Sequence, residues 1–364
     1  MHRCTLLTAV VLGVSLIGCG GPTPAVQNEQ AAGTAQRDDQ ERFLTPPLVS
    51  HLHTADPSAH VFNGRIHVYP SHDIEAGVPA DDLGNHFAMR DYHVFSMDRV
   101  GGEITDHGVA LDIANVPWAG RQMWAPDAAE RDGTYYFYFP AKDKADVFRI
   151  GVAVGDNPAG PFTARPEPIE GSYSIDPAVY RDRDGAHYMY FGGIWGGQLQ
   201  RWATGAYVAE DRYPEPDQPA FTPRVARLRD DMTGFAEPVR DVVILDEAGK
   251  PLTASDNARR FFEAAWMHRY GDTYYLSYST GDTHFIVYAT GDSPYGPFTY
   301  RGRILEPVLG WTSHHSIVEA DGQWYLFYHD AQLSGGQTHL RNIKVVPLTH
   351  RSDGTIETID PYRE

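Results

Sequence analysis

Three carboxylic acids stand at matching places in repeated segments of the chain. Asp56 and Glu263 each precede a turn glycine by eight residues, and Asp176 precedes one by nine, where the turn holds one extra residue. Carboxyl groups buried together are costly unless their pKa values are split, so that one is ionised while another keeps its proton. Two such groups facing each other across a pocket can cleave a glycosidic bond: one protonates the leaving oxygen, and the other activates water or attacks directly.

A fourth segment has the same offset, because His314 stands eight residues before a turn glycine. The remaining segment departs from it: Ala125 holds the equivalent position, and Asp127 follows two residues later. Each acid alone has a plainer explanation, since Asp-Pro pairs commonly start turns and a Glu before an apolar strand commonly lies at a solvated edge. Four titratable side chains at equivalent positions favour the functional interpretation.

The elements that would position these residues are five hairpins of similar sequence. Each has a two-residue turn followed by an alternating aromatic and β-branched strand, which is a strong hairpin signal. Their sequences are "NGRIHVYPS" from residue 63, "DGTYYFYF" from 132, "DGAHYMYF" from 184, "GDTYYLSYS" from 271 and "DGQWYLFYHD" from 321. Spacings of 50 to 87 residues predict an all-β fold, a five-bladed β-propeller with four-stranded blades and loop insertions. The innermost strand of each blade then runs along the central channel, so that one offset corresponds to one height.

Two nearly identical loops support the repeat. "GDNPAGPFT" at residues 155–163 and "GDSPYGPFT" at residues 291–299 share seven of nine residues. We expect them to form the same outer loop in the second and fourth blades, with Phe162 and Phe298 packed between blades. The largest gap between hairpins, about residues 205–262, predicts an insertion with a short helix at "PRVARLRDDM".

The N-terminus is typical of a bacterial lipoprotein. Arg3 precedes an apolar run too short to span a bilayer, and the run ends in Leu-Ile-Gly-Cys19, which resembles a lipobox. We expect residues 1–19 to be a signal peptide with Cys19 lipidated, residues 20–42 a flexible tether and residues 43–364 the propeller domain. An ordinary secretory peptide is the alternative. The predicted location is the bacterial cell envelope, with the domain facing the periplasm or the cell surface.

Cysteine content and charge limit the ligands and partners. Cys4 and Cys19 are the two cysteines of the chain, so the predicted domain has no disulfide and would hold a metal through oxygen or imidazole ligands. The formal charge of −18 argues against nucleic acid and anionic membrane surfaces as partners. We therefore expect membrane contact only through the lipid anchor. The sequence does not specify an oligomeric state.

The ordered set of motifs around these residues resembles glycoside hydrolase family 43. The motifs are "ADPSAHVFNGRIHVYPS", "MWAPD", "SIDPAVYRDRDG", a Glu before "YYLSYS", and "HHS" at 314–316, within residues 48–350. The resemblance implies a five-bladed propeller of inverting enzymes that act on xylose- and arabinose-containing glycans. It implies that Asp56 is the general base, Glu263 the general acid and Asp176 the group that tunes and orients the acid. Inversion places base and acid roughly 6.5–9.5 Å apart, with room for water.

One departure from the family pattern adjoins the acid. Family members often have Glu-Gly-Pro there, whereas this chain has Glu263-Ala264-Ala265. The change keeps the carboxyl group but alters the loop beside it.

The resemblance also implies further ligands of the site. His314 and His315 stand where the family often places a histidine that binds Ca²⁺ mostly through waters; the offset favours His314, and the alternative is a hydrogen bond within the channel. Trp124 and Trp195 are candidates to contact a sugar ring, although tryptophan is often a core residue. Arg341 matches a family arginine that reaches the sugar, with an exposed salt bridge as the alternative.

The expected activity is that of an exo-β-xylosidase acting on xylo-oligosaccharides. α-L-Arabinofuranosidase is the close alternative, because the two terminal sugars present similar hydroxyl groups. The chain leaves little sequence after the fifth hairpin for an appended sugar-binding domain, which favours small substrates. Two other classes stay open: a surface glycan-binding lipoprotein without catalysis and a structural propeller that scaffolds other proteins. The carboxyl groups at equivalent offsets argue against both.

Overall fold

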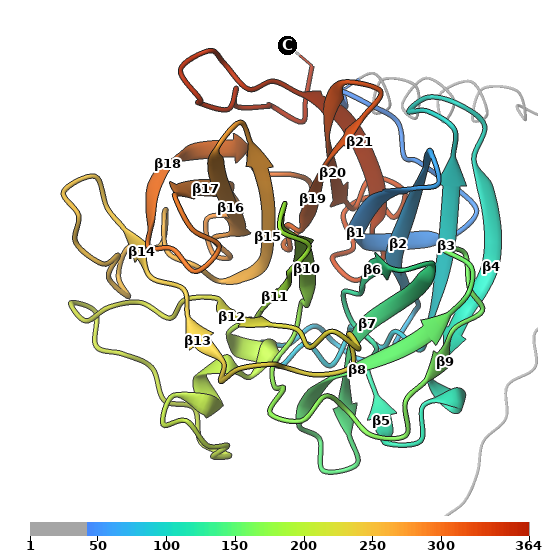
Figure 1. Ribbon diagram of the computed structural model, residues 1–364, viewed down its shortest axis with the longest axis horizontal. Coiled ribbons are helices and arrows are strands. Elements are labelled where there is room, and N and C mark those ends of the chain that lie inside the picture. Colours follow the sequence, from blue (N-terminus) through green and yellow to red (C-terminus); the bar gives the residue numbers. More distant parts are fainter. Residues whose placement is uncertain (1–41, 364) are drawn as a thin grey trace, which may run out of the picture. The chain divides into compact units, whose positions relative to one another are not determined.

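The computed structural model describes residues 42–363, and its strands form five sheets arranged around a common centre (Figure 1). This is the predicted five-bladed β-propeller. The predicted signal peptide with Cys19, and all but the last residue of the predicted tether, lie outside the described residues. Among the described residues, no helix is long and apolar enough to cross a membrane.

The first blade contains, in order across the sheet, β1 (His53–Phe62), β2 (Arg65–Asp73), β3 (Asp91–Met97) and β4 (Thr105–Asp112). The second contains β5 (Ala119–Arg121), β7 (Thr134–Asp143), β8 (Phe148–Gly155) and β9 (Thr163–Ala164), with β6 (Asp127–Arg131) also paired to β7. The third contains β10 (Ala178–Arg181), β11 (His187–Phe191), β12 (Arg224–Arg227) and β13 (Arg240–Asp241).

The fourth blade contains β14 (Ile244–Leu245), β18 (Phe298–Leu305), β17 (Ile286–Gly291), β16 (Thr273–Ser279) and β15 (Glu263–Tyr270). The fifth contains β19 (His315–Ala320), β20 (Gln323–Asp330) and β21 (Asn342–Leu348). Short 3₁₀ helices occupy η1 (Ile113–Asn115), η2 (Trp195–Gly197) and η3 (Leu199–Trp202).

Each predicted turn joins the innermost strand of a blade to the second strand. In the first blade, Asn63 and Gly64 both have positive φ, 53° and 76°, as a type I′ hairpin turn requires. The five innermost strands, β1, β6, β10, β15 and β19, contact one another in sequence around the centre, and β19 closes the ring against β1. Residues just before or at the start of these strands therefore meet at one end of the channel.

Two details differ from the predictions. The blades have three to five strands rather than a uniform four. The short helix expected at "PRVARLRDDM" is wrong, because Arg224–Arg227 forms β12, which pairs antiparallel with β11. The free edge of β11 supplies backbone partners, and Val225 and Ala226 become fully buried in the sheet. Tertiary pairing thus overrides the local preference for helix.

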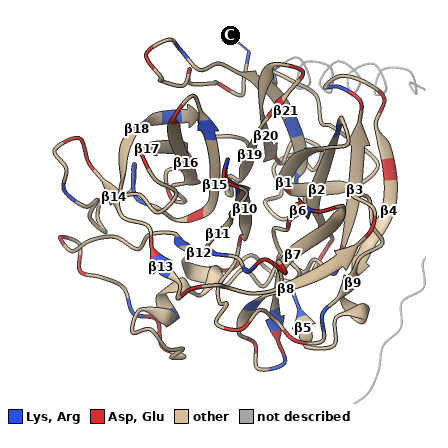
Figure 2. Cartoon of the chain, viewed as in Figure 1, with Lys and Arg blue, Asp and Glu red and all other residues tan. Residues whose placement is uncertain are grey.

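The prediction for the repeated loops is confirmed. Phe162 packs in a cluster with Tyr92 of the first blade and Phe137 of the second, and Phe298 packs with Tyr190 of the third blade and Tyr278 of the fourth. Charged residues, in contrast, are scattered over the loops and outer strands around the ring (Figure 2). Acidic and basic residues are interspersed along the chain in this view.

Candidate active site

A pocket of about 380 Å³ opens where the innermost strands begin. That volume lies within the range of small-molecule sites. The predicted site residues that line it are Asp56, Trp124, Asp176, Trp195, Glu263, His314 and Arg341. The four titratable residues with the shared offset, which are far apart in the sequence, therefore meet as predicted. His315 does not line the pocket.

Asp56 lies on β1 at a β-bulge, where the pairing register with β2 shifts between Ala55 and Ser58. The φ of Asp56 is 49°, a left-handed conformation uncommon outside glycine. β-Bulges commonly redirect side chains at functional sites. One carboxylate oxygen accepts a hydrogen bond from Ser71 Oγ (2.7 Å), and the other from Arg341 Nη1 (2.9 Å). The bulge and these two bonds fix the carboxylate in the pocket.

The charge state of Asp56 follows from these contacts. Burial alone would raise the pKa of Asp56, but the positive charge of Arg341 and the neighbouring ring of His329 outweigh burial and hold the pKa well below its usual range. Asp56 is therefore ionised at neutral pH. An ionised carboxylate can accept a proton from water.

Arg341 is held rigidly by a second carboxylate. Its Nε and Nη2 donate to the two oxygens of Asp73 (2.8 and 2.7 Å), and its backbone N–H donates to Asp73 Oδ2 (2.8 Å). Arg341 is 4% exposed, so the exposed salt bridge considered as the alternative is wrong. The guanidinium group lines the pocket and positions Asp56.

Asp176, which is buried, and Glu263, which is partly buried, form an acidic pair beside Asp56. Asp176, with φ 57°, precedes β10, and its Oδ2 accepts the backbone N–H of Ala264 (2.9 Å). Burial and the negative charges of Glu263 and Asp56 raise the pKa of Asp176 above its usual range. Burial, followed by the charge of Asp56, raises the pKa of Glu263 to about 8. Glu263 therefore keeps a proton at neutral pH.

The backbone around Glu263 is shaped for this role. Ala264, in place of the family's common glycine, adopts φ 61°, which costs about 1 kcal/mol for a residue with a Cβ. The conformation belongs to a bulge between Glu263 and Trp266 and aims the Ala264 N–H at Asp176. A Cβ on Gly193 would lie 2.6 Å from Ile175 Cδ1 and 3.1 Å from Glu263 Cβ, so glycine is required to pack against the acid.

The two histidines of "HHS" have different surroundings. His314 Nδ1 lies 3.7 Å from Asp56 Oδ1 and 3.8 Å from Asp176 Oδ2, and neither ring nitrogen makes a hydrogen bond within residues 42–363. His315 is fully buried, and its Nε2 bonds Ser277 Oγ at 2.6 Å. His314 therefore offers an unengaged imidazole at the pocket, whereas His315 stabilises the contact between blades.

Aromatic side chains form the walls of the pocket. Trp124 donates its Nε1–H to the carbonyl of Phe87 (2.9 Å), and Trp195 stacks on Trp311 with ring centroids 5.4 Å apart. Both predicted tryptophans thus line the pocket, and each also packs against other rings. Flat apolar faces of this kind suit the carbon face of a sugar ring.

Several pocket residues were missed by sequence reasoning. Trp311 stands only three residues before His314, so its closeness in sequence to a predicted site residue could have identified it as a pocket residue. Phe87 comes from a loop without periodicity, and Asp73 and His329, which contact Arg341 and Asp56 behind the pocket wall, lie near the ends of strands whose starts were recognised. Their roles follow only from contacts across blades.

Comparison with known sequences extends the resemblance. The sequence profile of "Glycosyl hydrolases family 43" matches residues 102–356. Xylosidase/arabinosidase 43A from Humicola insolens is 59% identical over 324 residues, covering 86% of this chain and 99% of that protein. Xylosidase/arabinosidase from Bacteroides ovatus is 58% identical over 322 residues, covering 88% of this chain and 98% of that protein.

Solved structures give the same result. A family 43 β-xylosidase/α-arabinofuranosidase from a compost microbial metagenome, in complex with xylotriose and in a calcium-free form, has a TM-score of 0.87 and 68% identity, covering 88% of this chain and 98% of that one. A family 43 enzyme from Xanthomonas citri complexed with xylotriose has a TM-score of 0.86 and 60% identity, covering 91% and 98%. The chain therefore belongs to glycoside hydrolase family 43 and is an enzyme that hydrolyses glycosidic bonds.

Proposed function

We propose that the protein is an inverting exo-β-xylosidase that releases terminal xylose from β-1,4-xylo-oligosaccharides. The observation that carries the proposal is the different surroundings of two carboxyl groups in one pocket: Arg341 bonds Asp56 and holds its pKa low, whereas burial and the charge of Asp56 raise the pKa of Glu263. Hydrolysis with inversion needs this division of a general base and a general acid. α-L-Arabinofuranosidase activity in the same pocket is the second candidate, favoured by the double names of the relatives.

In the proposed mechanism, Asp56 takes a proton from a water molecule as that water attacks the anomeric carbon. Glu263 gives its proton to the glycosidic oxygen as the bond to the leaving sugar breaks. Arg341, tied to Asp73, keeps Asp56 ionised and oriented. The charge of Asp56 raises the pKa of Glu263, and Asp176 fixes the backbone beside the acid through the N–H of Ala264.

The substrate assignment rests on the pocket and on the relatives. Enzymes that are 60% or more identical are described with xylotriose bound, so xylo-oligosaccharides are the first substrates to consider. A cavity of about 380 Å³, near the lower end of the range for small-molecule sites, suits the end of a sugar chain better than a long polymer segment.

Rates on two aryl glycosides test the proposal. We expect faster hydrolysis of an aryl β-xylopyranoside than of an aryl α-L-arabinofuranoside, and xylotriose should lose single xylose units from one end. Proton NMR of the first turnovers should show α-xylose, because inversion converts the β-anomer. A preference for the arabinofuranoside would promote the second candidate. No turnover of either glycoside or of xylotriose by folded protein would overturn the proposal.

We propose that the pocket binds Ca²⁺ through His314 and otherwise through water. The fit rests on the unengaged imidazole of His314 beside the carboxylates of Asp56 and Asp176, and a structural relative described as calcium-free is consistent with it. A bound divalent cation would stabilise the negative charge of Asp56. Calorimetric titration with Ca²⁺ should show binding that His314→Ala weakens and His315→Ala, whose ring faces Ser277, leaves in place. Equal binding by all three proteins would contradict this assignment.

We also propose that the enzyme is anchored in the bacterial cell envelope by lipid on Cys19. The support is the lipobox-like sequence that ends in Cys19 and the polar stretch that follows it. Membrane fractions should contain the natural protein and lose it in Cys19→Ala. An unchanged distribution would contradict the anchor.

A further inference from the structure

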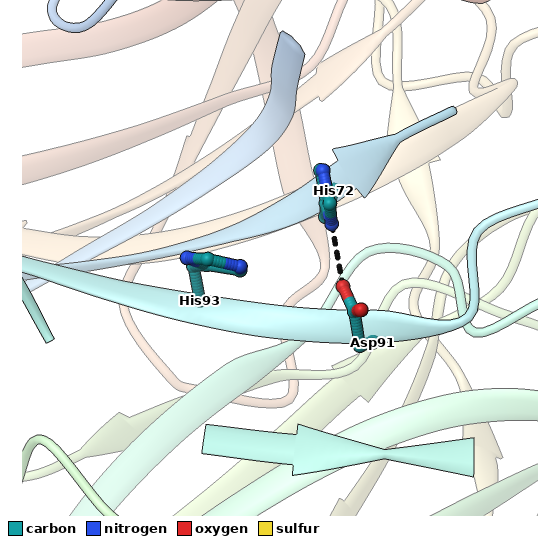
Figure 3. A group of neighbouring side chains, drawn as sticks. All are labelled: His72, Asp91 and His93. Carbon is teal, nitrogen blue, oxygen red and sulfur yellow. Dashed lines mark hydrogen bonds and ion pairs between the residues drawn. The ribbon is translucent and has the colours of Figure 1, made fainter. Parts of the chain in front are cut away.

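We propose that the first blade binds a divalent transition-metal ion such as Zn²⁺ through His72, Asp91 and His93 (Figure 3). His72 lies near the end of β2, and Asp91 and His93 lie at the start of β3. One ligand atom from each residue lies within 4.8 Å of the other two, and no other group of three or more such residues occurs within residues 42–363. Figure 3 shows the His93 ring extending along β3 toward the His72–Asp91 pair.

The ligand chemistry favours a transition metal over Ca²⁺. Two imidazoles and one carboxylate suit Zn²⁺, Ni²⁺, Co²⁺ or Fe²⁺, whereas Ca²⁺ prefers six to eight oxygen ligands. His72 Nδ1 and Asp91 Oδ1 are 2.5 Å apart, and the rings of His72 and His93 meet edge to face with centroids 5.1 Å apart. A metal ion can replace the proton that His72 and Asp91 share. Three protein ligands leave further positions for water.

A second layer of residues already orients the ligands. His93 Nδ1 lies 3.1 Å from Asp106 Oδ1, and the other oxygen of Asp106 lies 2.8 Å from His51 Nε2. A carboxylate that accepts from one imidazole nitrogen fixes the ring and leaves the other nitrogen to bind the metal, as in many carboxylate–histidine–metal arrangements. The contacts of Asp106 with His93 and His51 therefore support a metal site independently of the distances between the ligand atoms.

The position in the blade gives the ion a structural role. β2 pairs with β3 over Ile66–Val68, which lie opposite Phe95–Met97. The same register, continued along the two strands, places His72 opposite Asp91. The ion would tie the two strands beyond that pairing. None of the three ligands lines the active-site pocket, so this site is separate from the catalytic one.

The side chains are accessible to an ion from solvent. The side chains of His72, Asp91 and His93 are 17%, 21% and 13% exposed, which is enough for entry without unfolding the blade. The carboxylates of Asp91 and Asp106 supply negative charge to offset that of the cation.

Metal titration of the full chain, purified without a polyhistidine tag and stripped with EDTA, tests the proposal. We expect Zn²⁺ to bind at this site and to raise the melting temperature, and Co²⁺ to give visible absorption bands from nitrogen and oxygen ligands. His93→Ala should weaken Zn²⁺ binding at least about tenfold, abolish the Co²⁺ bands and remove the rise in melting temperature. Asp106→Asn should weaken binding about 10- to 100-fold while leaving all three ligands in place.

His107→Ala is the matched control, because His107 lies on β4 of the same blade outside the ligand group. It should bind Zn²⁺ as the natural protein does. Zn²⁺ bound elsewhere on the chain would be retained equally by every variant, so the comparison with His107→Ala separates it from Zn²⁺ bound at this site. If His93→Ala does not fold, Asp91→Asn replaces it. Equal Zn²⁺ affinity in the natural protein and in either ligand variant, or an equal loss in His107→Ala, would overturn the proposal.

Discussion

Replacing Asp56 by asparagine is expected to lower kcat by about 10³- to 10⁴-fold on aryl and oligosaccharide substrates alike. Asparagine keeps the size of the side chain and can still accept the hydrogen bond from Ser71, but it cannot take a proton from water. The loss should not depend on the leaving group, because the water must be activated for every substrate. Initial rates on aryl β-xylopyranosides of different leaving-group acidity measure this.

Two further variants sharpen this prediction. Asp217→Asn, the same change at an exposed loop residue, should leave kcat unchanged. Asp56→Ala makes room for azide, a nucleophile that needs no base, and should regain activity with added azide and form a glycosyl azide of inverted configuration. A folded Asp56→Asn enzyme that keeps more than a tenth of the natural kcat would remove Asp56 from the role of base.

The fold could be predicted because its signals are local. A two-residue turn and an alternating strand are specified within about ten residues of sequence, and each predicted hairpin formed where expected. The outer strands depend on distant partners. Arg224–Arg227 becomes a strand because the edge of β11 lies beside it, and β14 pairs in parallel with β18 although three strands of the same blade lie between them in the sequence. Local sequence does not contain these pairings.

The acidic residues of the site could be predicted for a related reason. The hairpin repeat fixes the height of each residue along the channel, so equal offsets bring Asp56, Asp176 and Glu263 together. The offsets alone do not indicate which of the acids is ionised, because that depends on where one cation lies. Arg341 approaches Asp56 at 2.9 Å, and the contact joins residues 285 positions apart in sequence. Asp73 was not predicted for the same reason, because its carboxylate orients the guanidinium group of Arg341 through a contact between residues far apart in the sequence.

Replacing Glu263 by glutamine is expected to separate substrates by their leaving groups. Hydrolysis of xylobiose should fall by about 10³- to 10⁴-fold, because a sugar alkoxide leaves only when protonated. A dinitrophenyl β-xyloside should lose far less, because its phenolate is a good leaving group without a proton. Within the described residues, the carboxyl group of Glu263 makes no hydrogen bond. Replacing it by an amide therefore leaves no partner unpaired. Glu210→Gln, at an exposed position, is the matched control.

The pH dependence of the same variant identifies the proton that is transferred. Activity requires Asp56 ionised and Glu263 protonated, so kcat/KM of the natural enzyme should fall as pH rises through about 8, the pKa of Glu263. The lowered pKa of Asp56 keeps the base ionised well into the acidic range. Glu263→Gln has no proton to lose, so its residual activity on the dinitrophenyl substrate should lack the alkaline decline. A decline that persists in Glu263→Gln, or an equal loss on xylobiose and on the activated substrate, would assign the acid to another residue, with Asp176, the next buried carboxyl group, as the first to examine.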